Sequence, residues 1–256
     1  MGFLSGKKIL IFGLHNKYSI AYGIAKSMYY QGADLAFIYK KKKYKKRIKM
    51  IAKEFNSNIV LYCNIKYTID IKNLFLNLKK IWSNFDGIVH SLAFLKKKFL
   101  KNNYINSFTK KSFISSHLIS SYSFVKLAKQ FKSILNKNSS LITVSFLGSQ
   151  KFIPNYNLMG LAKASLESNV RYMAASLGPK IRINAISPGP VKTVSSYNIK
   201  GLEKILYIYK KFSPMKRNIS IIEIGNVASF LSSNLSSGIT GQIIYVDGGF
   251  NIVGLY

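Results

Sequence analysis

The chain has 256 residues, of which 48% are hydrophobic, and 39 Lys plus Arg against 8 Asp plus Glu give a formal net charge of +31. This hydrophobic content is ample for a buried core and excludes an intrinsically disordered chain, while the absence of any uninterrupted apolar run of membrane-spanning length excludes a transmembrane helix. The single cysteine, Cys63, excludes an internal disulfide framework and is typical of a reducing compartment, so we expect a cytoplasmic protein.

The positive charge has two explanations. A field of this strength would attract anionic partners such as nucleic acid, acidic proteins and phosphorylated cofactors. The chain is also rich in Lys, Ile, Asn, Phe and Tyr, which A+T-rich codons encode, and drift toward such codons would raise the charge without selection. We favour drift. The sequence lacks a zinc pattern and an arginine-rich, aromatic-interleaved recognition element, so we expect no specific nucleic-acid binding.

Short apolar runs alternate with longer helical segments from one end of the chain to the other. We expect strands at 8–12, 35–39, 59–63, 87–91, 141–145, 182–186 and 242–246, and helices that include 20–31, 69–82 and 155–177. Several of these strands are continuously apolar, as strands covered by helices on both faces should be. The alternation predicts an α/β fold with a Rossmann-type, doubly wound parallel sheet. Because no repeat or Pro/Gly/Ser-rich linker interrupts it, we expect one domain over residues 1–256.

A glycine-containing turn follows the first strand. Gly13 permits a sharp exit from the strand, Ser19 lies where a helix could begin, and Gly23 would let that helix pack closely on the strand. Exposed backbone N–H groups and the positive end of the helix could then hold a pyrophosphate. The alternative is an ordinary turn of any α/β protein.

A lysine-rich run at 40–49 follows directly on the second strand. It is typical of the solvated start of a helix, and this interpretation is favoured. Its position at the end of a strand also allows a contact with a bound ligand.

Tyr156 and Lys163 lie in a segment that opens with Pro154 and Asn155, which suit a helix start, and that is closed at 178–179 by Gly-Pro. Seven residues at 100° each return to within about 20° of the starting direction, so the two side chains would share a helix face about 10 Å apart. A phenol and an ammonium so placed can address two parts of one extended ligand. The alternative is a half-buried Tyr and a surface Lys, and taken in isolation the pair favours this alternative.

Two further motifs lie near the ends of predicted strands. The segment 184–193 (Asn-Ala-Ile-Ser-Pro-Gly-Pro-Val-Lys-Thr) is stiffened by two prolines at the edge of the sheet where ligand crevices form. The segment 240–249 ends in Val-Asp-Gly-Gly, a strand followed by a tight turn. Each could be purely structural.

The order of these motifs resembles the short-chain dehydrogenase/reductase superfamily. Six residues separate Tyr156 from Lys163, whereas three do so in most members. With the turn at 13–21, Ile-Ser-Ser-Tyr-Ser-Phe at 119–124 and Pro-Asn-Tyr-Asn at 154–157, this spacing resembles the divergent enoyl-acyl carrier protein reductases. The resemblance extends from residue 1 to about residue 253.

The resemblance implies an enzyme that reduces trans-2-enoyl-acyl carrier protein with NADH, in the last step of the fatty-acid elongation cycle. It implies acyl carrier protein as partner, a homotetramer, and a mobile substrate loop at about 193–207. The resemblance implies Tyr156, Lys163 and Phe146 as the catalytic residues, of which Tyr156 would hydrogen-bond the thioester oxygen and Lys163 would bind the nicotinamide ribose. Leu95 would bind the substrate together with Tyr156. The remaining residues implied at the cofactor are Gly13, Ser19, Ile20, Lys40, Asn64, Ile65, Leu92, Val191, Lys192, Thr193, Val194, Ser195 and Ser196.

Four positions depart from the pattern of that family. Phe146 replaces a second active-site Tyr that many members have, Asn64 replaces an Asp at the adenine, and Ala93 replaces a Gly by the cofactor. Lys40 replaces a Gln beside the adenosine ribose. Because Lys40 and Lys41 could pair with a 2′-phosphate, NADPH stays open as the cofactor, although we favour NADH.

Three rival hypotheses remain. One is a carbonyl reductase of the same superfamily, against which the spacing of Tyr156 and Lys163 counts. Another is a non-catalytic nucleic-acid-binding protein, and the third is a decayed enzyme kept as a scaffold, which Phe146 and Ala93 suggest. The three histidines show no metal-ligand spacing, so we expect no metal site.

Overall fold

The computed structural model describes residues 2–96, 99, 103–194, 196–198 and 201–254. Within them, seven strands form one parallel sheet in the order β3-β2-β1-β4-β5-β6-β7. The strands are β1 (Lys8–Phe12), β2 (Asp34–Tyr39), β3 (Val60–Tyr62), β4 (Phe85–His90), β5 (Leu135–Val144), β6 (Ile181–Pro188) and β7 (Ile243–Val246). The doubly wound Rossmann-type sheet expected from the sequence is confirmed.

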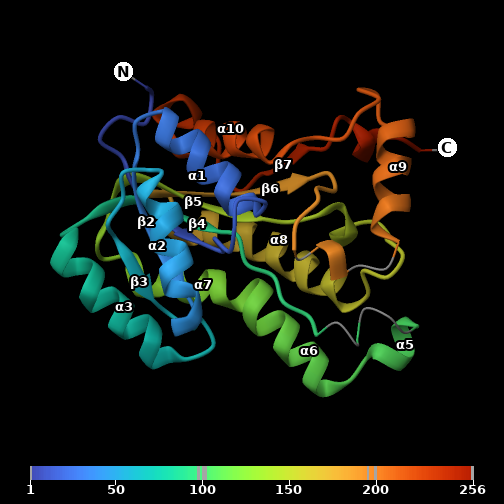
Figure 1. The fold of residues 1–256 in the computed structure, drawn as a ribbon, viewed down its shortest axis with the longest axis horizontal. Coiled ribbons are helices and arrows are strands. Elements are labelled where there is room, and N and C mark those ends of the chain that lie inside the picture. The colour runs from blue at the N-terminus through green and yellow to red at the C-terminus, as the bar shows by residue number, and fades with distance from the viewer. Residues whose placement is uncertain (1, 97–98, 100–102, 195, 199–200, 255–256) are drawn as a thin grey trace.

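Helices cover both faces of this sheet (Figure 1). They are α1 (Ile20–Tyr30), α2 (Lys45–Lys53), α3 (Thr68–Ile81), α5 (Tyr104–Ser107), α6 (Lys110–His117), α7 (Ser123–Phe131), α8 (Leu158–Leu177), α9 (Leu202–Phe212) and α10 (Ile221–Ser232). Short helical turns occur at Lys42–Tyr44, Leu118–Tyr122, Leu147–Ser149, Ser196–Asn198, Asn234–Ser236 and Phe250–Ile252. None of the described helices has the length and apolarity needed to cross a bilayer.

The core has two layers because side chains of a strand alternate between the faces of the sheet. Leu10 and Phe12 of β1 pack into one cluster with α3, α7 and α8. Ile9 and Ile11 of the same strand pack into the other cluster with α1, α2 and α10. The central strands are buried on both sides, which explains their continuously apolar sequences.

Most expected boundaries differ from the observed ones by a residue or two. The main exception is β5, which begins at Leu135 although its apolar run begins at 141. Its polar first half still forms strand because Leu135 pairs with Phe85 of β4 and Ser140 pairs with Gly87.

Gly23 was expected to let α1 pack closely on the first strand, and this expectation is wrong because the close contact is with α10. A Cβ at Gly23 would overlap the backbone oxygen of Ile221, and a Cβ at Gly225 would overlap the backbone oxygen of Gly23. The glycine therefore permits α1 to cross α10 backbone to backbone, rather than to approach β1.

Candidate active site

All strands are parallel, so the segments that follow β1, β4, β5 and β6 emerge at the same edge of the sheet. This edge brings together most of the residues singled out in the sequence.

The turn after β1 requires glycine. Gly13 has φ +100, and a Cβ there would overlap the backbone oxygen of Ser91 at the exit of β4. Ser19 is the N-cap of α1, as expected, but its Oγ donates to the Asn16 carbonyl oxygen (2.7 Å) and makes no cap to the helix. The first backbone N–H groups of α1, beginning at Ile20, thus have no side-chain cap at the positive end of the helix.

Tyr156 does not belong to the helix that carries Lys163, contrary to the expectation. The helix α8 begins at Leu158, because Asn155 and Asn157 adopt φ of +63 and +45 and break the helical path. The proline and asparagine that suggested a helix start belong instead to a turn, which carries Tyr156 toward the end of β5. The shared helix face predicted for the two side chains is wrong.

Tyr156 and Lys163 nevertheless both lie beside the carboxyl end of β5. The Nζ atom of Lys163 donates to the backbone oxygen of Val144 at 2.6 Å. Two residues further on, the Phe146 ring packs against the Tyr156 ring with centroids 4.9 Å apart. Both side chains are buried, Tyr156 at 8% exposure and Lys163 at 3%.

Burial sets the protonation of this pair. Desolvation lowers the pKa of Lys163 to about 8, which the negative charge of Glu167 partly opposes. Desolvation raises the pKa of the Tyr156 phenol, and Glu167 raises it further. At neutral pH the site therefore presents an ammonium and a protonated phenol, and each of these groups favours a nearby negative charge.

The Tyr156 ring packs against an apolar wall of side chains. Tyr156 and Met159 form a small cluster with the partly buried side chains of Leu95, Phe146 and Ile153. The structure thus brings together the three residues expected at the substrate, Tyr156, Phe146 and Leu95.

The other expected cofactor residues follow the carboxyl ends of β2, β3 and β4, which lie in one half of the sheet together with β1. Lys40 is exposed directly after β2, and Asn64 follows β3 with its Oδ1 accepting from the Lys66 backbone N–H at 3.4 Å. Ile65 is buried, and Leu92 is partly buried against the same core cluster. These four residues line one stretch of the sheet edge.

The lysine-rich run lies beside the glycine turn. Its exposed residues begin α2, as the favoured interpretation predicted, and Tyr44 packs edge-on against His15 with ring centroids 5.5 Å apart. Desolvation and then the charges of Lys40 and Arg47 lower the pKa of His15. Desolvation likewise lowers the pKa of Lys40, with Lys41 and Lys66 acting in the same direction and Tyr44 opposing. The end of β2 is therefore strongly electropositive.

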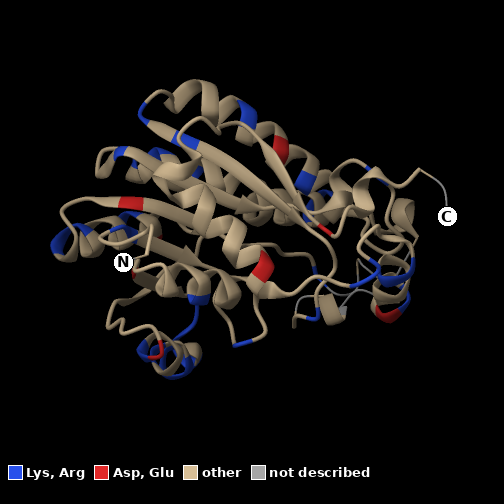
Figure 2. Cartoon of the chain, turned by 90° about the horizontal axis from the view of Figure 1, so that it is seen from above, with Lys and Arg blue, Asp and Glu red and all other residues tan. Residues whose placement is uncertain are grey.

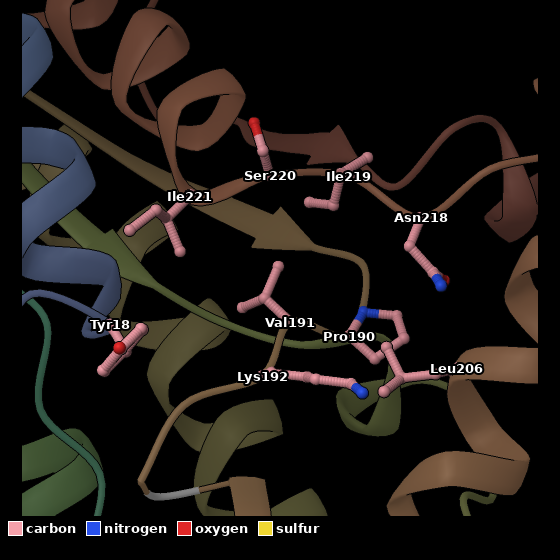
Figure 3. Close-up of a pocket in the computed structure, with 9 residues that line it drawn as sticks. All are labelled: Tyr18, Pro190, Val191, Lys192, Leu206, Asn218, Ile219, Ser220 and Ile221. Atoms are coloured by element: carbon pink, nitrogen blue, oxygen red, sulfur yellow. The ribbon is translucent and has the colours of Figure 1, made fainter.

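The segment after β6 borders a pocket of about 330 Å³ (Figure 3). The pocket is lined by Tyr18, Pro190, Val191, Lys192, Leu206, Asn218, Ile219, Ser220 and Ile221. Val191 is buried in its floor, and the Lys192 side chain extends toward α9, where Nζ lies 3.2 Å from a Glu203 carboxylate oxygen.

Thr193 and Ser196 bond to each other. The Thr193 backbone N–H donates to the Ser196 Oγ at 2.8 Å, and the Ser196 backbone N–H donates to the Thr193 Oγ1 at 3.0 Å. Val194 between them is 57% exposed, and Ser195 lies outside the described residues. Any contact of Thr193 or Ser196 with a cofactor must exchange these bonds.

Two buried groups lie near the site: Glu167, which the sequence analysis missed, and His90, to which it gave no specific role. Glu167 lies one helical turn beyond Lys163, and the i, i+4 spacing of Lys and Glu was a signal that could have identified it. His90 is fully buried with its ring nitrogens bonded to Thr143 and Ser123, and burial lowers its pKa to about 3. The described residues contain no group of three potential metal ligands.

The chain is similar to known proteins over nearly its whole length. Residues 13–251 match the family model described as enoyl-(acyl carrier protein) reductase. The whole chain is 56% identical to the enoyl-[acyl-carrier-protein] reductase [NADH] FabI of Buchnera aphidicola subsp. Schizaphis graminum and 48% identical to that of Escherichia coli K12, covering 98% of each. The crystal structure of enoyl-[acyl-carrier-protein] reductase (NADH) from Aquifex aeolicus superposes with a TM-score of 0.96, at 41% identity and full coverage of both chains. A reductase from Anaplasma phagocytophilum in complex with NAD also gives 0.96, at 37% identity, 99% coverage of this chain and 97% of that chain.

Proposed function

The chain belongs to the enoyl-(acyl carrier protein) reductase family, and from this premise we propose which residues carry out its reaction. The chain reduces a trans-2-enoyl thioester on acyl carrier protein with NADH in fatty-acid synthesis. The observation that supports the assignment of residues is that Tyr156 and Lys163 are both buried beside the carboxyl end of β5, against Phe146 and Val144 respectively.

The residues at the sheet edge fit a dinucleotide. Gly13, at φ +100, lets the chain turn sharply beside the exit of β4, and the uncapped N-terminus of α1 at Ser19 and Ile20 suits a pyrophosphate. Lys40, Asn64, Ile65 and Leu92 would hold the adenosine half. The nicotinamide half would lie between Lys163 and the segment formed by Val191, Lys192, Thr193, Val194, Ser195 and Ser196. When bound, NADH supplies the hydride for the double bond.

The chain's own residues act on the thioester. As hydride adds to the β-carbon, the electron pair of the double bond would shift toward the thioester carbonyl, and negative charge would gather on its oxygen, to which the Tyr156 hydroxyl would donate a hydrogen bond. A proton from solvent would then add to the α-carbon and restore the carbonyl, which completes the reduction. The Lys163 ammonium, held by the Val144 carbonyl oxygen, adds a positive charge that favours the same anion. A hydrogen-bond donor aimed at a developing oxyanion lowers the activation barrier by about 3–4 kcal/mol. Phe146 offers no second hydroxyl, so Tyr156 is the phenol donor, and the apolar wall with Leu95 receives the start of the acyl chain.

The partner and the assembly are further proposals. Acyl carrier protein is acidic, so the basic surface would speed its encounter with the enzyme. Figure 2 shows Lys and Arg on helices at both ends of the molecule and few acidic residues, so the positive field is broad rather than confined to one patch. We propose one domain, a cytoplasmic location and a homotetramer, whose contacts would cover apolar side chains such as Tyr122 and Tyr172, which are 51% and 74% exposed.

The decisive test is NADH oxidation by the purified protein with crotonyl-acyl carrier protein, run beside NADPH and beside a panel of carbonyl substrates. We expect turnover with the enoyl thioester and NADH, and a KM for the carrier protein that rises with salt. Turnover of a carbonyl substrate alone would move the chain to the rival reductase class. No oxidation even in a single turnover would indicate a decayed scaffold, and a KM independent of ionic strength would remove the electrostatic role of the basic surface.

A further inference from the structure

Glu167 is a buried carboxylate in the centre of α8. It is 4% exposed, and it follows Lys163 by four residues, so the two side chains lie on the same face of the helix one turn apart. No ion pair in the described part of the chain includes it. A buried charge is costly unless its surroundings compensate it, so its partners indicate why it is there.

These partners come from the segment 145–150, which joins β5 to the Tyr156 turn. The hydroxyls of Ser145 and Ser149 both donate to Oε1 of Glu167, at 2.5 and 2.6 Å. The Gln150 Nε2 atom donates to Oε2 at 3.5 Å. Ser145 directly follows β5, and Ser149 ends the helical turn Leu147–Ser149. One carboxylate thus holds both ends of the segment.

The same segment positions the ring of Tyr156. Phe146 packs against that ring at 4.9 Å between centroids, and a Cβ at Gly148 would lie 2.5 Å from Tyr156 Cδ1. The backbone at 148 therefore lies directly against the phenol ring, and a displacement of the segment would displace the hydroxyl.

The charge of Glu167 reaches Lys163 as well. Desolvation lowers the pKa of Lys163, and Glu167 acts in the opposite direction. The other titratable groups that couple to this pair are His90 of β4, whose pKa Lys163 lowers, and Tyr156 and Tyr245 of β7, whose pKa values Glu167 raises. Among the described residues, Glu167 is the one carboxylate whose charge acts on Lys163.

We propose that Glu167 is a positioning residue that acts on catalysis in two ways. Through Ser145 and Ser149 it holds the segment 145–150 so that Tyr156 faces the thioester, and by its negative charge it keeps the buried Lys163 protonated. This inference rests on the proposed function, because it concerns the phenol and the ammonium assigned there.

Two substitutions separate the two actions. Glu167→Gln keeps an oxygen that can accept from both serine hydroxyls but removes the charge. Glu167→Asp keeps the charge but is shorter by one methylene, so it cannot reach both hydroxyls. Asp86→Asn is the matched control, because Asp86 is also a buried carboxylate that accepts several hydrogen bonds, yet it lies at the amino end of β4.

The readout is the pH profile of kcat and KM for the crotonyl thioester, with NADH affinity and the melting temperature measured beside it. For Glu167→Gln we expect the alkaline fall in kcat to begin at lower pH than in the wild type, because Lys163 loses its proton more easily. For Glu167→Asp we expect the alkaline fall in kcat to begin at the same pH as in the wild type. We expect kcat itself to fall about tenfold at all pH values, with KM changed less than twofold. Ser149→Ala should reproduce a smaller part of the same fall, and Asp86→Asn should alter only the melting temperature.

The outcomes distinguish this inference from the function on which it rests. A wild type with no activity on enoyl thioesters would overturn the proposed function. An active wild type whose pH limb is unmoved in Glu167→Gln, and whose kcat is unchanged in Glu167→Asp, would overturn the role of Glu167 alone. An equal loss of kcat in Asp86→Asn would show that any buried carboxylate matters only for stability, and would also overturn it.

Discussion

Lys163→Met is expected to stabilise the protein while it removes most of the activity. Methionine fills nearly the same volume as the lysine stem, so the change removes the ammonium without opening a cavity. Burial lowers the pKa of Lys163 from its ordinary 10.5 to about 8. The difference corresponds to about 3 kcal/mol by which the protonated side chain destabilises the folded state at pH 7.

Part of this gain in folding stability is offset by a lost hydrogen bond. The variant loses the hydrogen bond from Nζ to the Val144 oxygen and leaves a buried carbonyl unsatisfied, which costs about 1–2 kcal/mol. The net result is a free energy of unfolding raised by about 1–2 kcal/mol at pH 7, or a Tm raised by about 4 °C. In contrast, kcat for the crotonyl thioester should fall about 100-fold, because the positive charge beside the developing anion is gone.

The stability difference must also depend on pH with a definite sign. Because the folded pKa lies below the unfolded one, the unfolded chain binds more protons between about pH 8 and pH 10.5, so this group makes the wild type more stable as pH rises through that window. The excess in free energy of unfolding of Lys163→Met over the wild type should therefore be largest at pH 7 and smaller at pH 9.5. Urea unfolding at both pH values measures it, with Lys129→Met, an exposed lysine of α7, as the control. A variant that is less stable than the wild type at pH 7, or whose advantage is the same at both pH values, would refute the reasoning.

Three further changes test other parts of the site. Tyr156→Phe should lower kcat about 100-fold by removing the phenolic donor while NADH affinity changes less than twofold; an unaltered rate would dismiss Tyr156 as the donor. Gly13→Ala should lower the free energy of unfolding by at least about 2 kcal/mol and weaken NADH binding, since a Cβ at φ +100 would collide with the Ser91 oxygen. Calorimetry would contradict this if the unfolding free energy and the NADH affinity both match those of the wild type. Lys40→Gln should lower the kcat/KM ratio of NADPH to NADH about tenfold, because it removes a charge from the end of β2; a ratio that does not move would place Lys40 away from the 2′ position.

Much of the fold was predictable because it rests on local patterns. Runs of apolar residues marked strands buried on both faces, and the sheet adopts the predicted parallel architecture. Ser19 marked the start of α1 because serine is a residue type that often occupies the position before the first helical turn. The start of α8 could not be found in the same way. Asn155 and Asn157 adopt left-handed conformations that the sequence permits but does not demand, and Pro154 suited a helix start equally well.

Within the site, the sequence determined the kinds of chemical group and their positions along the chain: a phenol, an ammonium, and a glycine at the exit of the first strand. Only the tertiary structure decided which partners these groups meet. It placed Gly23 against Gly225 of another helix, gave Lys163 the Val144 carbonyl oxygen, and directed two serine hydroxyls to Glu167. The physical reason is that hydrophobic periodicity is a local property of the chain, whereas a buried polar atom is satisfied by whatever donor or acceptor the fold brings within reach, however distant in sequence.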